Sequence, residues 1–106
     1  MTAFFVVRAE VADPADRDAF DAWYRDVHLP RFATTFRADR AWRTWSRTSP
    51  STHVAYYEFK STELAQAVPQ SAEIKPLIAE FDKAWGGRVT RTREIEEVVQ
   101  TFLPSD

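Results

Sequence analysis

Residues 3–30, AFFVVRAEVADPADRDAFDAWYRDVHLP, contain a strand pattern followed directly by a helix pattern, and this order decides the fold. The segment Ala3–Val11 is rich in Phe and Val, which favours a strand. Asp13 and Pro14 suit the N-cap and the first position of a helix, because Asp accepts hydrogen bonds from free amides and Pro has no amide hydrogen to lose. Apolar residues then recur at helical spacing, at Ala19, Phe20, Trp23 and Val27. We predict that Pro30 stops or bends this helix.

The rest of the chain predicts three more strands and a second helical region. The strands are expected over residues 39–48, 53–59 and 89–102. Ser49-Pro50-Ser51 is a turn sequence that joins the first two of these strands in a hairpin. A short helix starts at Ser61, is interrupted by Pro69, continues over residues 71–85 and ends at Gly86-Gly87. This order predicts a ferredoxin-like α+β fold, βαββαβ, with two helices on one face of a four-stranded antiparallel sheet.

Composition limits the classes of protein that this chain can belong to. Its 106 residues suit one domain, predicted over residues 1–106. The absence of cysteine excludes a disulfide scaffold and a thiol nucleophile, and with two histidines we expect no metal site. The net charge of −2 argues against nucleic acid as a partner. The sequence has no long apolar run and no signal-peptide pattern, so we expect a cytoplasmic protein without a membrane partner. It has no dinucleotide-binding or phosphate-binding motif, so we expect no cofactor.

Large apolar residues point to both faces of the predicted sheet. The pairs with opposite orientation are Phe4 and Phe5, Trp42 and Trp45, Tyr56 and Tyr57, and Val98 and Val99. A sheet covered by helices on one side normally alternates apolar and polar residues. We therefore expect a second copy of the sheet to cover the other face in a two-fold symmetric homodimer. The alternative is that these aromatic residues are scattered singly over the surface.

Residues 20–30, FDAWYRDVHLP, resemble the F-x-x-W-Y-x-x-x-H-x-P signature on the first helix of EthD-like proteins, which belong to the dimeric α+β barrel superfamily. Residues 57–61, YEFKS, are similar to that family's third strand where it runs into the second helix. The resemblance implies a homodimeric barrel with a pocket in each subunit between helices and sheet. Relatives include cofactor-free monooxygenases acting on polyketides, polyketide cyclases, muconolactone-type isomerases and haem-degrading enzymes. The resemblance thus implies a small, mostly aromatic ligand rather than one reaction.

His28 is the first candidate for a catalytic residue. Phe20, Tyr24 and His28 are spaced by four and so lie along one side of the helix, beside its apolar stripe. Imidazole has an unperturbed pKa of about 6.5, which suits proton transfer near neutral pH. Together with the family signature, this favours His28 as a general base at a pocket. The alternative is a histidine that caps the C-terminal end of the helix.

His53 and Tyr57 are the other catalytic candidates, because they share one face of the third strand. If that face looks toward the helices, both side chains join His28 in the pocket. The position of His53 at a strand end favours instead a half-exposed histidine at the mouth of the hairpin. The choice between Tyr56 and Tyr57 depends on register, since a shift of one residue exchanges their faces.

Aromatic residues supply the candidates for ligand binding. Trp23, Tyr24, Trp45 and Trp85 can line a hydrophobic site that stacks on a planar ligand. Ordinary core packing is the preferred alternative for Trp23 and Trp85. Either Trp42 or Trp45 must face away from the helices, where it would anchor the dimer interface.

Arginine residues surround the tryptophans of the second strand. Together, arginines and tryptophans can indicate single-stranded nucleic acid, but the acidic composition favours ordinary solvated strand edges. Arg43 is the arginine that we assign to a ligand carboxylate or enolate. Arg91 and Arg93 are expected to form cross-strand ion pairs with the neighbouring glutamates.

Three functions are compatible with these residues. The first is a small cofactor-independent monooxygenase, cyclase or isomerase that acts on an aromatic or polyketide-like metabolite, with His28 as general base. The second is a non-catalytic binding protein for a hydrophobic small molecule, and the third is a structural dimerisation module. A cavity beside His28 would favour the first two over the third.

Overall fold

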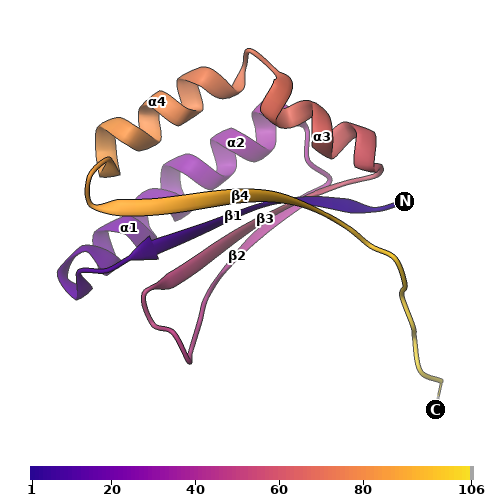
Figure 1. The fold of residues 1–106 in the computed structure, drawn as a ribbon, viewed down its shortest axis with the longest axis horizontal. Coiled ribbons are helices and arrows are strands. Elements are labelled where there is room, and N and C mark those ends of the chain that lie inside the picture. Colours follow the sequence, from indigo (N-terminus) through magenta and orange to yellow (C-terminus); the bar gives the residue numbers. More distant parts are fainter. Residues whose placement is uncertain (106) are drawn as a thin grey trace.

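The computed structural model describes residues 1–105 and shows a four-stranded antiparallel sheet with the helices on one face (Figure 1). The strands are β1 (Ala3–Val11), β2 (Arg40–Trp45), β3 (Thr52–Phe59) and β4 (Val89–Glu97). Their order in the sheet is β2-β3-β1-β4, so β1 and β3 are central and β2 and β4 are edges. This order follows from two βαβ units that share one sheet. The predicted ferredoxin-like fold is confirmed.

The first helical region runs without a break from Pro14 to Phe36 and packs on one face of the sheet (Figure 1). It comprises a 3₁₀ turn at Pro14–Asp16, α1 (Arg17–Trp23), a π-helical segment at Tyr24–His28 and α2 (Leu29–Phe36). The Asp13 carboxylate accepts a hydrogen bond from the Ala15 amide at 2.9 Å, as expected of an N-cap. Arg37, in the left-handed region with φ 55°, ends the region.

Pro30 does not stop the helix, contrary to one form of the prediction. It is the second residue of α2, and the backbone hydrogen bonds just before it follow the π-helical pattern. The Leu29 amide donates to the carbonyl of Tyr24, five residues back instead of four. The π-helical segment therefore absorbs the disturbance that a proline causes. Its two ends, Tyr24 and His28, are both buried.

The second helical region contains two helices, α3 (Thr62–Gln70) and α4 (Ile74–Trp85), instead of one interrupted helix. Ser61 caps α3, accepting a hydrogen bond from the Leu64 amide at 3.2 Å. Pro69 lies next to the end of α3, and α4 begins three residues later than predicted. Gly86 comes directly after α4, where an added Cβ would clash with the backbone carbonyl of Asp82. None of the helices within residues 1–105 has the length and apolar character needed to cross a bilayer.

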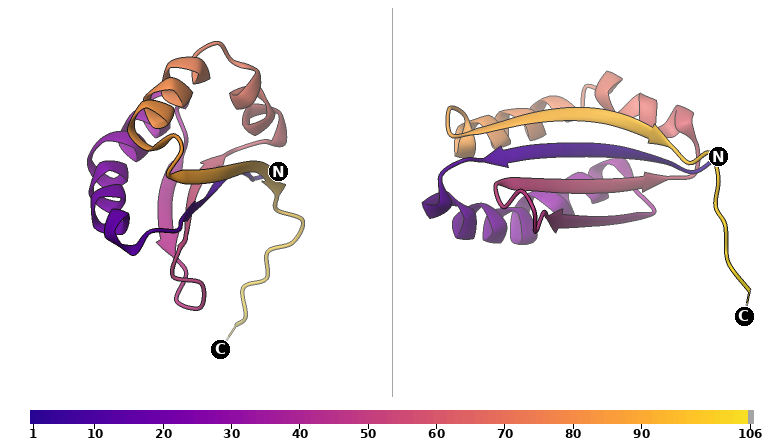
Figure 2. Two further views of the ribbon diagram at one scale, coloured as in Figure 1. Left: turned by 60° about the vertical axis from the view of Figure 1, so that its left-hand side comes forward. Right: turned by 60° about the horizontal axis from the view of Figure 1, so that its bottom comes forward.

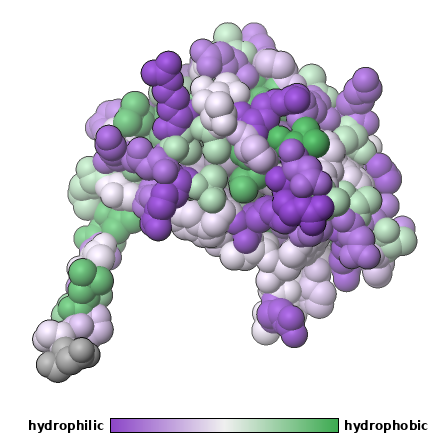
Figure 3. Space-filling view, turned by 180° about the vertical axis from the view of Figure 1, so that it is seen from behind, coloured by the Kyte–Doolittle hydropathy of each residue, from purple (hydrophilic) through white to green (hydrophobic). Residues whose placement is uncertain are grey.

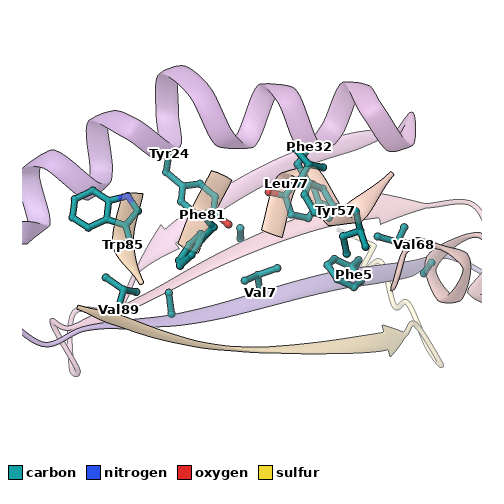
Figure 4. Close-up of a cluster of buried hydrophobic side chains, with 14 of the residues drawn as sticks. Phe5, Val7, Tyr24, Phe32, Tyr57, Val68, Leu77, Phe81, Trp85 and Val89 are labelled. Carbon is teal, nitrogen blue, oxygen red and sulfur yellow. The ribbon is translucent and has the colours of Figure 1, made fainter. Parts of the chain in front are cut away.

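The hydrophobic core fills the space between the helices and the inner face of the sheet (Figure 4). The register sets Phe5 opposite Tyr57 on β3 and opposite Ile95 on β4, so these side chains share the helix-facing side. Tyr57 is therefore the inward residue and Tyr56 the outward one. In the same way Trp45 on β2 faces the core, because its partner in the register is the buried His53.

The outer face of the sheet carries an aromatic cluster on three strands. The ring of Trp42 lies 5.6 Å from Phe4 and stacks on Tyr56 at 5.4 Å. The outward residues of β4 are polar, since Thr90, Thr92, Glu94 and Glu96 occupy this face. The expectation of apolar residues on both faces therefore holds for β1, β2 and β3 but is wrong for β4.

The last strand ends at Glu97 and not at residue 102 as predicted. The Val98 amide donates to the Thr2 carbonyl at 2.9 Å, and the chain then leaves the body of the protein as an extended tail (Figures 1 and 2). Three apolar side chains on this tail, Val99, Phe102 and Leu103, are 82%, 76% and 84% exposed. The space-filling view shows this hydrophobic tail projecting from one side of the molecule (Figure 3).

Candidate functional site

A small cavity of ≈ 10 Å³ lies beside His28, between α4, α2 and the inner face of β1 and β4. Its polar lining residues are His28, Arg91 and Arg93, and the others are apolar. A space of this size holds about one water molecule. This space is too small for an organic ligand unless it widens, so the predicted ligand pocket beside His28 stays a prediction.

His28 is held between a tryptophan and a carboxylate. It is 6% exposed, and its ring stacks on Trp23 at 4.8 Å with an interplanar angle of 16°. Its Nδ1 lies 3.7 Å from Oε1 of Glu80 on α4, and Glu80 also pairs with Arg31. Both Nδ1 and this Oε1 are buried without a hydrogen-bond partner among residues 1–105. His28 is followed by further helix as far as Phe36, so the alternative role as a C-terminal cap is wrong.

Burial lowers the pKa of His28 to about 4, and the Glu80 carboxylate opposes this shift. Removal from water disfavours the charged imidazolium, whereas a nearby negative charge favours it. His28 is consequently neutral at pH 7 and able to accept a proton. Because its Nδ1 faces Glu80, Nε2 is the nitrogen left to approach a ligand.

Tyr24 and Tyr57 place two hydroxyl groups in the core (Figure 4), although neither side chain lines the cavity beside His28. Both side chains are fully buried, and neither hydroxyl makes a hydrogen bond of good geometry in the described part of the chain, although the two hydroxyls interact with each other. The rings of Tyr24 and His28 are 5.0 Å apart. Burial raises the pKa of Tyr24 to about 12 and that of Tyr57 well above its usual value. Both hydroxyls thus stay protonated and can donate to an oxygen anion.

His53 is fully buried, so the expectation of a half-exposed histidine at the hairpin mouth is wrong. The rings of Phe20 and Trp45 cover it at 5.1 Å and 5.0 Å. Burial, followed by the charge of Arg43, lowers its pKa to about 4. His53 contacts the Tyr24 ring at 4.6 Å but does not line the cavity beside His28.

Arg43 and Trp45 are bound to a carboxylate of the protein itself. Asp21 Oδ1 accepts hydrogen bonds from Arg43 at 2.7 Å and from Trp45 Nε1 at 2.8 Å. These bonds hold the pKa of Asp21 below its usual value. Trp45 borders a separate open hollow of ≈ 570 Å³ at the surface. The structure therefore does not bring these two predicted ligand-binding residues together with His28.

The remaining predicted ligand-binding residues lie in or beside the core. Trp23 packs on His28 and so forms one wall of its environment. Trp85 is buried against Phe20 at 5.3 Å, as the core-packing alternative requires. Within residues 1–105, no three His, Cys, Asp or Glu side chains converge in a way that would hold a metal ion.

Three charged residues of the site were missed from the sequence: Glu80, Arg91 and Arg93. Arg91 and Arg93 do not form the expected cross-strand pairs, because they face the helices. Arg91 pairs with Asp82 of α4 at 3.0 Å and lies 3.8 Å from the centre of the Phe81 ring. Arg93 forms no ion pair with any residue that the structure describes. The sequence did carry one signal of their orientation. Arg91 and Arg93 lie at every second position between Val89 and Ile95, whose side chains face inward.

Comparison with known proteins supports the fold. No family model and no curated protein matches the chain in sequence. An EthD family protein from Bacillus halodurans has 19% identity and a TM-score of 0.67 over 93% of this chain and 100% of its own. A mutant of SnoaB, a cofactor-independent oxygenase from Streptomyces nogalater, has 18% identity and a TM-score of 0.62 over 98% of each chain.

A dimeric ferredoxin-like protein from an uncultured marine organism is 12% identical, with a TM-score of 0.72 over 96% of this chain and 99% of its own. At such identities the similarity establishes the fold. The chain thus has the fold of an EthD family protein, in agreement with the resemblance of residues 20–30.

Proposed function

We propose that the protein binds a small aromatic or polyketide-like molecule beside His28 and acts on it as a cofactor-independent monooxygenase, cyclase or isomerase. The observation that carries this proposal is the buried pair of His28 and Glu80, whose facing atoms have no hydrogen-bond partner among residues 1–105, beside the ring of Tyr24. A buried polar group without a partner costs free energy, so it is retained chiefly where function needs it. The SnoaB neighbour, a cofactor-independent oxygenase, supports the same class of chemistry.

The arrangement suits proton abstraction. Neutral His28 takes a proton from a carbon or hydroxyl of the ligand through Nε2, and the electron pair stays on the ligand as an enolate or phenolate. Glu80 stabilises the imidazolium that forms, because an opposite charge at 3.7 Å favours the protonated ring. The hydroxyls of Tyr24 and Tyr57 donate to the new oxygen anion. In an oxygenase, the ligand carbanion then reacts with O2 to form a peroxide, which takes up the proton from His28 and loses water to leave a carbonyl group. In a cyclase the carbanion attacks an electrophilic carbon of the same ligand, and in an isomerase it is reprotonated at another carbon.

Ligand binding requires the cavity to widen from ≈ 10 Å³. Typical small-molecule sites occupy about 300–1,000 Å³. The apolar side chains of α4 that line the cavity, Leu77, Ile78 and Phe81, are the ones that must move. We expect them to change rotamer, or α4 to shift, when a ligand enters.

We also propose that the protein is a homodimer in which a second copy covers the outer face of the sheet. The cluster of Phe4, Trp42 and Tyr56 lies on this face, which no helix of the described chain covers (Figure 1). The tail and the β2–β3 hairpin project on the same side of the molecule and flank this face (Figures 1 and 3). The exposed apolar residues of the tail have a place to pack on a second copy. The dimeric ferredoxin-like neighbour supports this arrangement.

A ligand screen followed by a turnover assay tests the function. Aromatic and polyketide-like compounds are screened for stabilisation of the protein against heat, and each hit is incubated with the protein in air and under argon. Mass spectrometry of the products separates oxygenation from cyclisation and isomerisation. We expect His28→Asn to bind the hit and to lower turnover by roughly 10²-fold or more. Unchanged turnover in this variant would reject His28 as the base.

A non-catalytic binding protein is the second candidate, favoured by the low pKa of His28. A base with a pKa of about 4 has little driving force to remove a proton at pH 7. In that case, hits bind and are recovered unchanged from the wild-type protein. Then His28→Asn alters affinity modestly and abolishes no reaction.

A further inference from the structure

Arg91 and Arg93 lie next to each other on the inner side of β4, and both line the cavity beside His28. β4 is an edge strand, and Arg93 reaches solvent while lining the cavity, so it stands at the outer rim. Arg91 is fixed by Asp82 and by the face of Phe81. Arg93 has neither an ion pair nor a hydrogen bond from its side chain to any of residues 1–105.

The charges around the cavity do not balance. Glu80 is matched by Arg31, and Arg91 is matched by Asp82. His28 is neutral at pH 7, and so are the two tyrosines. Arg93 therefore leaves one positive charge uncompensated beside apolar walls. Burial of part of the side chain, and then the charge of Arg91, lowers the pKa of the Arg93 guanidinium, while Asp82 opposes this shift.

We propose that the ligand is an acid whose carboxylate binds Arg93 at the β4 edge while its ring system extends toward His28. A guanidinium binds a carboxylate with two parallel hydrogen bonds, which makes arginine suited to this contact. Arg43, which the sequence suggested for this role, is already bound to Asp21. The proposal rests on the proposed function, because it assumes that the ligand occupies the site beside His28.

The proposal has a consequence for His28. A carboxylate brought into the cavity adds a negative charge that favours the imidazolium. The bound ligand would therefore raise the pKa of His28 from about 4 toward neutral pH. Recognition of the acid and activation of the base would be linked in this way.

A matched pair of probes tests the inference. 2-Naphthoate and its neutral amide, 2-naphthamide, have the same ring system and differ in charge. Affinities are measured by calorimetry for the wild type, Arg93→Met, Arg93→Lys and a control, Lys60→Met, which removes one positive charge from an exposed position after β3. We expect the wild type and the control to prefer naphthoate by tenfold or more. Arg93→Met should lose this preference but keep its affinity for the amide, and Arg93→Lys should retain part of the preference.

Each other outcome contradicts the inference in a distinct way. Equal binding of both probes to the wild type would overturn the proposal that the ligand is recognised through a carboxylate, and the proposed function would stand. A preference that survives in Arg93→Met would remove Arg93 from the site. Equal loss of both probes in Arg93→Met would mean a structural role for the arginine. If neither probe binds up to millimolar concentration, the proposed function fails together with this inference.

Discussion

Oε1 of Glu80 lies 3.7 Å from Nδ1 of His28, although the two residues come from different helical regions. The distance exceeds that of a hydrogen bond, and neither atom has another such partner among the described residues. Burial favours the neutral imidazole, while Glu80 favours the protonated one. Burial outweighs the carboxylate, so His28 is neutral at pH 7, and Glu80 is placed to stabilise a proton that the histidine accepts.

Replacing the Glu80 carboxylate by an amide should weaken this base. In Glu80→Gln, we expect the pKa of His28 to fall further below about 4, because the charge that opposes burial is gone. Turnover of a substrate should fall by about tenfold. NMR titration of the imidazole C2 proton measures the pKa, and Glu73→Gln, an exposed residue just before α4, is the control. An unchanged or raised pKa of His28 would show that Glu80 does not act on it.

Protonation of the two buried histidines should make stability depend on pH. Both have a pKa of about 4 in the folded protein against 6.5 ordinarily. Between these values the unfolded chain binds more protons, so the free energy of unfolding falls as pH falls from 6.5 toward 4. Each histidine contributes a slope of about 1.4 kcal/mol per pH unit.

Urea unfolding at pH 7, 6 and 5 measures this slope, and His53→Gln should reduce it by about half. The comparison uses the slope, so a lower overall stability of the variant does not affect it. A slope that is the same in His53→Gln and the wild type would mean that His53 is not neutral in the folded protein at these pH values.

The elements set by local chemistry were predictable from the sequence. The bounds of β1 and the caps at Asp13 and Ser61 depend on neighbouring residues, and the structure confirms them. The end of β4 depends on a distant partner instead. Val98 continues the apolar pattern, but Glu97 already pairs with Ala3, the first residue of β1, so the ladder has no further strand residue to pair with.

The candidate site was predicted in part for the same reason. His28 and Tyr24 are recognisable from their spacing on one helix. Glu80 joins them only because α4 packs against that helix, a contact between residues far apart in the chain. The role of Arg93 likewise depends on which face of β4 turns toward the helices. From its charge alone, the side chain was expected on the outer surface of the sheet.

The outer aromatic cluster should hold the proposed dimer together. In Trp42→Glu, an unpaired charge would be buried in the interface at a cost of several kcal/mol, so the dimer should dissociate. Sedimentation of the wild type at micromolar concentration should give twice the monomer mass of 12.3 kDa, and that of the variant the monomer mass. Gln66→Glu adds the same charge on an exposed position of α3 and should leave the dimer intact. A wild-type monomer would reject this interface.

The tail should contribute to the same interface. Replacing both Phe102 and Leu103 by Asp removes its apolar side chains, which have no packing role within the described chain because they are exposed. We expect the dissociation constant of the dimer to rise by at least tenfold, while circular dichroism of the folded domain stays the same. Thr101→Asp changes an exposed polar residue of the tail and serves as the control. An equal effect of both variants would point to charge repulsion instead of lost packing.

The hydroxyl of Tyr57 should matter for function and not for stability. It is buried and makes no hydrogen bond of good geometry within residues 1–105, although it interacts with the Tyr24 hydroxyl, so Tyr57→Phe removes a desolvated polar group. We expect the free energy of unfolding to stay the same or to rise by up to about 1 kcal/mol. Turnover should fall by about 10²-fold, because the variant cannot donate to the oxygen anion. Tyr56→Phe, the same change on the outer face, is the matched control and should keep its turnover. A Tyr57→Phe protein that is clearly less stable yet fully active would mean that this hydroxyl has a structural partner and no part in the reaction.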